Sequence, residues 1–273
     1  MSNANGSPDS RFPSYEKPPV NEVLCGIRFE IPQGLKLPHI GLLWEKFRKE
    51  YPNIQHTMPI AASPNEFLID IATGAPIPRV WFINRADNQL IQFQTDRLYF
   101  NWRQRGDSYP RYSNLIVQWE AVLNTVETFF AESEIGKLTP IECDLTYINH
   151  IEKGSGWESV DDLPNVFKDF GWKKSRSRFL PNPTAIGWEA FFPLPDKKGQ
   201  LLARLRQGTR VEDQVPLLIL EMIARGLGES KDRRGIREWF DTAHEWIVCG
   251  FADLTTDRIQ TKVWRREHAS ADG

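Results

Sequence analysis

Apolar residues along this chain follow two spacings, one typical of strands and one typical of helices. In the segment that begins at Val20 they occupy every second position, namely Val23, Cys25, Ile27 and Phe29. This alternation predicts a strand with one buried face. From Leu115 to Phe129 they recur at steps of four and three, which predicts a long amphipathic helix.

Shorter apolar segments lie between these two elements. Pro38 introduces a short helical pattern that ends at Pro52. β-branched or aromatic runs follow at 67–71, 79–84, 90–94 and 98–102. The connections between these runs are too short for parallel crossovers, so we predict an antiparallel meander.

The second half of the chain repeats this order. It predicts a strand near 141–151, a short helix at 160–170 that Pro164 interrupts, strands at 186–192, 201–206 and 217–224, and a long helix at 236–254. Leu115 and Ile236, the first apolar positions of the two long helices, are 121 positions apart, and so are Val20 and Ile141. Equal spacing of like elements suggests an internal duplication.

These patterns predict an α+β fold built from two pseudo-repeats, each a strand, a helix, antiparallel strands and a long helix, that form one continuous body. We expect the first repeat at 20–139 and the second at 140–267. Residues 1–19 are rich in Ser, Asn, Pro and Gly and cannot bury much surface, so we predict a disordered tail there and a second one at 268–273.

Composition narrows the setting of the protein. The formal net charge is -2 and the pI is about 6.3, so the chain as a whole offers no attraction for nucleic acid or an anionic membrane. Its three cysteines suit reduced thiols. No signal peptide and no apolar run of 18 residues is present in the sequence, so we expect a cytoplasmic protein with no membrane partner.

One set of residues suggests a serine hydrolase. Gly106, Asp107 and Ser108 spell the nucleophile block of GDS-type esterases, and Asp241 and His244 have the spacing that supplies an acid and a base. The context argues against this hypothesis, because antiparallel strands surround Ser108 and the other two residues lie inside a helix. The remaining histidines and cysteines are scattered, so we expect neither a cofactor nor a metal site.

Charge is unevenly distributed within the second half. Seven acids and two bases lie between Glu142 and Asp169, whereas nine bases and two acids lie between Lys173 and Arg210. Arg204 and Arg206 share a face of their predicted strand. This basic region could bind phosphates of a nucleic acid or an acidic partner, and its alternative explanation is a solvated sheet face.

A second group of candidate contact residues surrounds the junction between the meander and the first long helix. Trp102, Arg103, Arg105 and Arg111 combine aromatic and guanidinium groups, which are the types that anchor interfaces. In the alternative interpretation Trp102 and Tyr112 cap the core, while Arg103 and Arg111 brace the turn.

The same region carries a resemblance to a known family. Lys17 to Val23 (KPPVNEV), Asn101 to Arg103 (NWR), Tyr109 to Tyr112 (YPRY) and Tyr147 to His150 (YINH) resemble, in order, landmarks of a sporadically distributed bacterial family without an assigned activity. The resemblance implies an accessory role, for example in a defence or toxin-linked operon, through a protein partner.

The sequence thus favours a non-enzymatic binding protein that recognises a protein partner. Its predicted contact residues are Trp102, Arg103, Arg105, Arg111, Arg204 and Arg206. A serine hydrolase and a nucleic-acid binder are the alternative hypotheses, and the patterns do not determine an oligomeric state.

Overall fold

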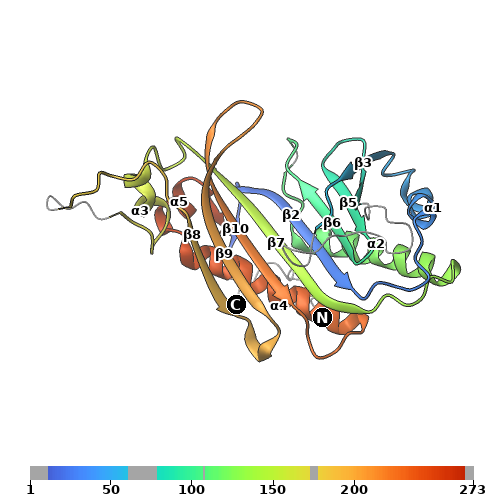
Figure 1. Ribbon diagram of the computed structural model, residues 1–273. Coiled ribbons are helices and arrows are strands. Elements are labelled where there is room, and N and C mark those ends of the chain that lie inside the picture. The colour runs from blue at the N-terminus through green and yellow to red at the C-terminus, as the bar shows by residue number, and fades with distance from the viewer. Residues whose placement is uncertain (1–11, 61–78, 107, 173–177, 268–273) are drawn as a thin grey trace, which may run out of the picture. The chain divides into compact units, whose positions relative to one another are not determined.

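The structure is a computed structural model that describes residues 12–60, 79–106, 108–172 and 178–267. Antiparallel strands packed against helices give it an α+β fold, which confirms the predicted fold class (Figure 1). The strand predicted at 67–71 and the tail predicted at 268–273 lie outside the described residues.

The first group of elements follows the predicted order with one addition. It comprises β2 (Val20–Phe29), α1 (Pro38–Phe47), β3 (Asn53–Thr57), β4 (Arg79–Ile83), β5 (Gln89–Gln94), β6 (Arg97–Arg103) and α2 (Tyr112–Glu132). The addition is β3, whose residues are almost all exposed. An exposed edge strand has no buried face, so hydrophobic alternation could not reveal it.

The second group of elements follows the predicted order with two additions, a 3-10 turn at 195–197 and a short helix at 257–262. It comprises β7 (Pro140–Glu152), the 3-10 turn η2 (Val160–Asp162), α3 (Leu163–Val166), β8 (Trp188–Pro193), η3 (Pro195–Lys197), β9 (Gln200–Thr209), β10 (Pro216–Gly226), α4 (Arg233–Leu254) and the short α5 (Asp257–Lys262). The predicted duplication stays a prediction, because a shared element order does not establish a common origin.

Residues 12–19 correct the predicted N-terminal tail. Ser14–Tyr15 form β1, which pairs antiparallel with β11 (Arg266–Glu267). The Tyr15 ring is buried and lies edge-on to Phe251 and Trp264 at centroid distances of 5.8 and 6.0 Å. A single aromatic side chain that is buried among other rings can order a polar segment. The average composition of 19 residues does not reveal such a side chain.

Two compact units divide the chain. The first, called here the α2 unit, comprises Glu22–Leu145 and Gly226–Arg237. The second, the α4 unit, comprises the described residues up to Asn21 together with Thr146–Arg225 and those from Glu238 onward. Both β7 and α4 pass from one unit into the other along the chain, so the units interleave in sequence instead of meeting at a single boundary.

In the α2 unit, neighbouring strands follow the order β3-β4-β5-β6-β2, and each pair is antiparallel. One face of the strands other than β3 is apolar and packs against α2, whose buried residues include Leu115, Trp119, Val126 and Phe130. Helix α1 adds to this cover, since Phe47 contacts Phe82 of β4 at a ring distance of 6.2 Å. The helices thus shield the apolar side of this sheet.

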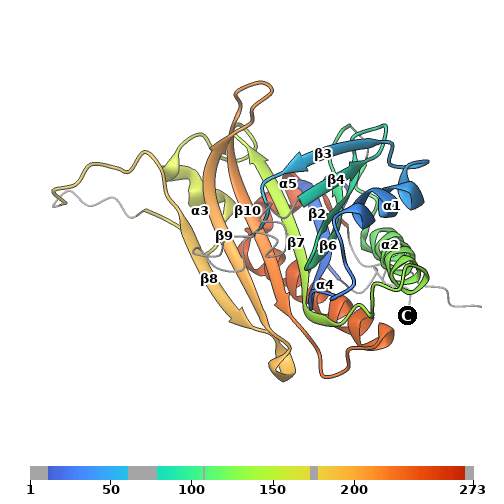
Figure 2. The ribbon, with the colours of Figure 1, turned by 45° about the vertical axis from the view of Figure 1, so that its right-hand side comes forward.

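In the α4 unit, the order of neighbouring strands is β7-β10-β9-β8. Strands β8, β9 and β10 pair antiparallel, and β8 is the last strand of the order (Figures 1 and 2). Helix α4 lies along one face of these strands in both views. Beneath it, Ala203 and Leu205 of β9 and Leu220 and Met222 of β10 are fully buried.

Candidate functional site

A pocket of about 600 Å³ lies in the α4 unit between α4 and the strands β8, β9 and β10. We call it the β8 pocket. Its walls are mainly apolar, and its lining residues are Asp169, Trp188, Ala190, Phe192, Leu201, Met222, Glu245, Trp246, Cys249, Gly250, Asp253 and Leu254. The volume lies within the range of about 300–1,000 Å³ that is common for ligand sites.

Strand register places the β8 residues of the pocket. Trp188, Ala190 and Phe192 lie opposite Leu205, Ala203 and Leu201 of β9, respectively. Directly opposed residues share a face of the sheet, so these three β8 side chains lie on the same side as the residues buried beneath α4. They are themselves only partly buried, because the helix covers β9 and β10 better than it covers the last strand.

Helix α4 supplies the opposite wall through two adjacent stripes. Residues four positions apart lie above one another on a helix, and the stripes are Glu245, Cys249, Asp253 and Trp246, Gly250, Leu254. A Cβ at Gly250 would lie 3.3 Å from Met222 Cε and 3.5 Å from Leu201 Cδ2. The glycine therefore lets the helix approach the strands closely at the base of the pocket.

Packing behind the pocket fixes one of its aromatic walls. The Trp188 ring lies edge-on to Phe170 at a centroid distance of 4.1 Å, and Phe170 in turn contacts Phe167 at 5.4 Å. Phe167 is fully buried. Trp188 is thus held from behind while its other side lines the pocket, so little ordering is needed when a group binds against it.

The charged residues of the pocket lining are all acidic. Asp169, Glu245 and Asp253 are exposed carboxylates, and within the described part of the chain none of them has a hydrogen-bond or ion-pair partner. Burial raises the pKa of the Cys249 thiol, and Glu245 and Asp253 raise it further, whereas Arg266 lowers it. The pocket therefore combines an apolar interior with a negative rim.

Two of the residues predicted from sequence lie together in the α2 unit. Arg103 and Arg105 both form ion pairs with Asp87, and Arg105 Nε lies 2.8 Å from Asp87 Oδ2. Trp102, also predicted as a contact residue, is only 2% exposed and packs edge-on to Tyr109. This burial corrects the expectation for Trp102, because a core side chain offers no surface to a partner.

Arg111 stands at the start of α2 with a φ of 69°, next to the buried Tyr112. A positive φ at a residue with a Cβ is uncommon, so this position is constrained by the turn. The burial of Trp102 and Tyr112 and the turn position of Arg111 agree with the alternative interpretation, in which these residues cap the core and brace the turn.

The other two predicted arginines lie on β9 and are matched by acids. Arg204 Nε is 2.5 Å from Glu189 Oε1, and Arg206 Nη2 is 3.1 Å from Glu221 Oε1. Glu221 also lies 3.4 Å from Arg204. Two carboxylates offset two guanidinium groups here, so this strand face has little net charge with which to attract phosphates. Of the predicted basic region, 173–177 lies outside the described residues.

The geometry around the proposed hydrolase residues gives that hypothesis no support. His244 is buried, with its ring 5.9 Å from that of Phe12 and 6.1 Å from that of Tyr147. Asp241 is exposed on α4, and Ser108 is exposed in the segment that follows β6. The His244 imidazole thus packs against two aromatic rings within the α4 unit.

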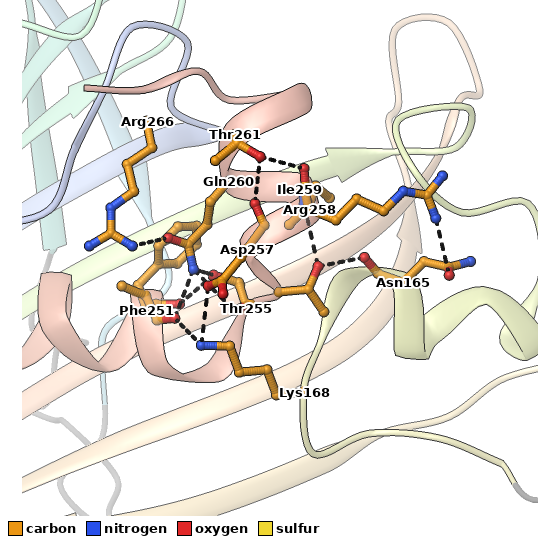
Figure 3. Close-up of polar contacts among 12 residues, drawn as sticks. Asn165, Lys168, Phe251, Thr255, Asp257, Arg258, Ile259, Gln260, Thr261 and Arg266 are labelled. Atoms are coloured by element: carbon orange, nitrogen blue, oxygen red, sulfur yellow. Dashed lines mark hydrogen bonds and ion pairs between the residues drawn. The ribbon is translucent and has the colours of Figure 1, made fainter. Parts of the chain in front are cut away.

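A cluster of polar side chains at α5 is structural (Figure 3). Gln260 is fully buried, and its Nε2 donates to the carbonyl oxygens of Ala252 and Thr255 at 2.8 and 3.0 Å. Its Oε1 accepts from Arg266 at 2.8 Å and from the Tyr15 hydroxyl at 3.2 Å. Burial raises the pKa of Tyr15 to about 12, so this donor stays protonated. Gln260 thereby fastens β1 and α5 to the end of α4.

A second polar network crosses four strands of the α2 unit. Trp81 of β4 donates to Gln92 of β5, Gln92 donates to Asn101 of β6 at 2.7 Å, and Asn101 donates to Glu22 of β2. Burial raises the pKa of Glu22, against the lowering effect of its hydrogen bond from Asn101. These groups satisfy one another, so the network organises the sheet face and offers few free donors.

No protein-family model matches the chain, and no curated protein matches it either. The resemblance to a sporadic bacterial family therefore stays a prediction. Among the described residues, no helix is both long and apolar enough to cross a membrane. The same residues contain no group of three or more histidine, cysteine or acidic side chains arranged to hold a metal ion.

Sequence reasoning missed the β8 pocket, although two signals for it were present. On α4, Trp246 and Gly250 continue the helical spacing beside the main apolar stripe, which makes the stripe wider than one sheet contact needs. In β8, the run WEAFFP carries aromatic residues on both faces of one strand. Together these patterns indicate an apolar surface that the fold leaves partly uncovered.

Proposed function

We propose that the protein is a non-enzymatic binding protein and that it recognises a protein partner at the β8 pocket. The observation that carries this proposal is the pocket itself, an apolar cavity of about 600 Å³ whose wall is the last strand of its sheet order. A site of this size and lining is the default location for a bound group.

The last strand favours a polypeptide over a small molecule. Among the described residues, no strand pairs with the outer side of β8, and Phe191 and Phe192 on it are 56% and 37% exposed. An open edge with exposed aromatics is a template for another strand. An extended segment paired with β8 would point every second side chain to the face of Trp188 and Ala190, and so into the pocket.

The arginines that were predicted from sequence as contact residues have at most a secondary role in this proposal. Arg103 and Arg105 share Asp87, and Arg204 and Arg206 share Glu221, so each pair already has an acidic partner. The three free cysteines suit a reducing compartment, which supports a cytoplasmic location as part of this proposal. Its predicted accessory role in a defence or toxin-linked system is part of the same proposal.

The test is a partner-capture experiment in which the pocket is filled. Tagged protein would be expressed in its native host and purified as wild type, as Ala190→Phe, and as Arg103→Ala plus Arg111→Ala. We expect Ala190→Phe to lose a partner that the wild type and the arginine variant retain. Capture that survives Ala190→Phe but fails in the arginine variant would move the site to the β6–α2 junction and overturn the proposal.

A further inference from the structure

The acidic rim of the β8 pocket differs from the clusters of paired acids and arginines in the same unit. Elsewhere in the α4 unit, several carboxylates form ion pairs with arginines: Glu152 and Asp213 with Arg210, and Glu221 with Arg206. At the pocket, Glu245, Asp253 and Asp169 stand without such partners among the described residues. Three like charges around one cavity create a negative potential, which a bound cation would neutralise.

Aromatic side chains in the same pocket suit a cation with an apolar stem. Trp188 and Trp246 contribute to its walls, and indole is the best of the protein rings for cation–π contact. The long methylene stems of lysine and arginine pack on apolar surface while their charged ends reach a polar rim. The β8 pocket offers such a surface and such a rim within one cavity.

Arg266 is the basic group whose charge acts on Cys249 in the pocket wall. Its guanidinium donates to Gln260 Oε1 at 2.8 Å and does not belong to the pocket lining. It therefore offsets part of the negative potential from outside the cavity without occupying it. No basic residue is found among the lining residues of the pocket in the described structure.

We infer that the group bound in the β8 pocket is a hydrophobic cation, namely a lysine or arginine side chain that the partner places at a pocket-facing position of its added segment. This inference rests on the proposed binding function and specifies the chemistry of the partner. A second copy of this chain fits poorly as the occupant, because the exposed edge strands described above, β8 (WEAFFP) and β3 (NIQHT), contain no lysine or arginine.

Three probes that share a phenylethyl group and differ in charge test the inference: 2-phenylethylammonium, 2-phenylethanol and 3-phenylpropanoate. Calorimetry gives their affinities, and mass spectrometry measures how far each protects Cys249 from iodoacetamide. Cys25 and Cys143 are buried and serve as unreactive internal references. We expect the ammonium probe to bind roughly tenfold more tightly than the alcohol at low salt, and the carboxylate probe to bind least.

The matched variant is Glu245→Gln plus Asp253→Asn, which keeps the shape of both side chains and removes two charges. It should reduce the affinity for the ammonium probe to that for the alcohol, while Glu212→Gln, an exposed acid on the β9–β10 hairpin, should leave it unchanged. Added salt should narrow the difference between the ammonium probe and the alcohol.

The outcomes separate the two proposals. Equal protection of Cys249 by the ammonium probe and the alcohol would overturn the cationic ligand and leave the binding function in place. Protection by none of the probes at millimolar concentration would also overturn it. If, in addition, Ala190→Phe retained the partner, the proposed function would fail as well.

Discussion

The two long helices, α2 and α4, cover their strands to different extents. In the α2 unit the sheet face receives α2 and also α1, a helix of ten residues that buries Ile40, Leu43 and Phe47. In the α4 unit the corresponding position in the chain holds only η2 and the four-residue α3. The α4 unit, in which the short helix α3 takes the place of α1, is the unit whose last strand lines a pocket.

This difference shows how a binding site can arise without a special motif. Both units bury aromatic and aliphatic side chains beneath a long helix, and Trp119 on α2 and Trp239 on α4 are each 1% exposed. A sheet that is wider than its helical cover leaves apolar side chains at its margin. Trp188, Ala190 and Phe192 are those margin residues, so the site follows from an incomplete layer of helix.

The largest expected effect contrasts tryptophans from the two helices. Trp119→Ala removes a fully buried ring and should lower the free energy of unfolding by about 3–5 kcal/mol. Trp246→Ala removes a partly exposed ring at the pocket and should cost about 1 kcal/mol. Urea denaturation measures both values. A cost at Trp246 equal to that at Trp119 would show that the pocket is closed in solution.

A second contrast uses two alanines that face each other across β8 and β9. Ala190 and Ala203 are direct register partners on the same sheet face, but Ala203 is fully buried whereas Ala190 lines the pocket. Ala203→Phe should destabilise the protein by about 1–3 kcal/mol through overpacking. Ala190→Phe should be tolerated within about 0.5 kcal/mol, because its ring enters open space.

Thermal unfolding of these two variants tests the geometry independently of any partner. Since the same substitution is made at neighbouring positions, differences in strand propensity largely cancel. Equal destabilisation at both positions would contradict the presence of the pocket.

The elements of the fold could be read from sequence where a buried face repeats, as in β2, α2 and α4. The exposed β3 has no such face, and the two-residue β1 and β11 are too short to show one. The candidate site could not be read in the same way. Arg103 and Arg204 are conspicuous as residue types, yet only the folded structure shows that Asp87 and Glu189 lie against them.

The pocket escaped prediction for a related reason. Its residues come from β8, β9, β10, α4 and the segment that follows α3, and each of its apolar residues separately reads as an ordinary apolar position. Whether an apolar residue is covered depends on the width of the sheet relative to its helices, which is a property of tertiary packing and not of local periodicity. Trp188 and Trp239 are the same residue type, but the fold covers Trp239 and leaves Trp188 only half-buried.

A pH experiment tests the polar network of the α2 unit, where a smaller effect is expected. Burial raises the pKa of Glu22 in the folded protein, so its ionised form is disfavoured there. The favourable contribution of its protonated form is present below the unfolded pKa and is lost as the pH rises through the folded value. Glu22→Gln keeps an acceptor for Asn101 and should raise the free energy of unfolding at pH 7.

The same variant should flatten the pH dependence of unfolding above the ordinary pKa of a glutamic acid. Urea denaturation at pH 4, 5.5 and 7 supplies the comparison with wild type. A loss of stability at pH 7 in Glu22→Gln would instead mean that the charge itself stabilises the network through Arg103.

The smallest stability change is expected at Gly250, where two effects of opposite sign meet. Replacing a helical glycine with alanine favours the helix by roughly 1 kcal/mol. The new Cβ would lie 3.3 Å from Met222 Cε, the flexible end of a long side chain that can move by a few tenths of an ångström. We therefore expect Gly250→Ala to change the free energy of unfolding by no more than about 0.5 kcal/mol. Because the methyl group lies at the base of the β8 pocket, the substitution should still weaken binding of 2-phenylethylammonium, and a variant with unchanged stability and unchanged binding would place the ligand away from α4.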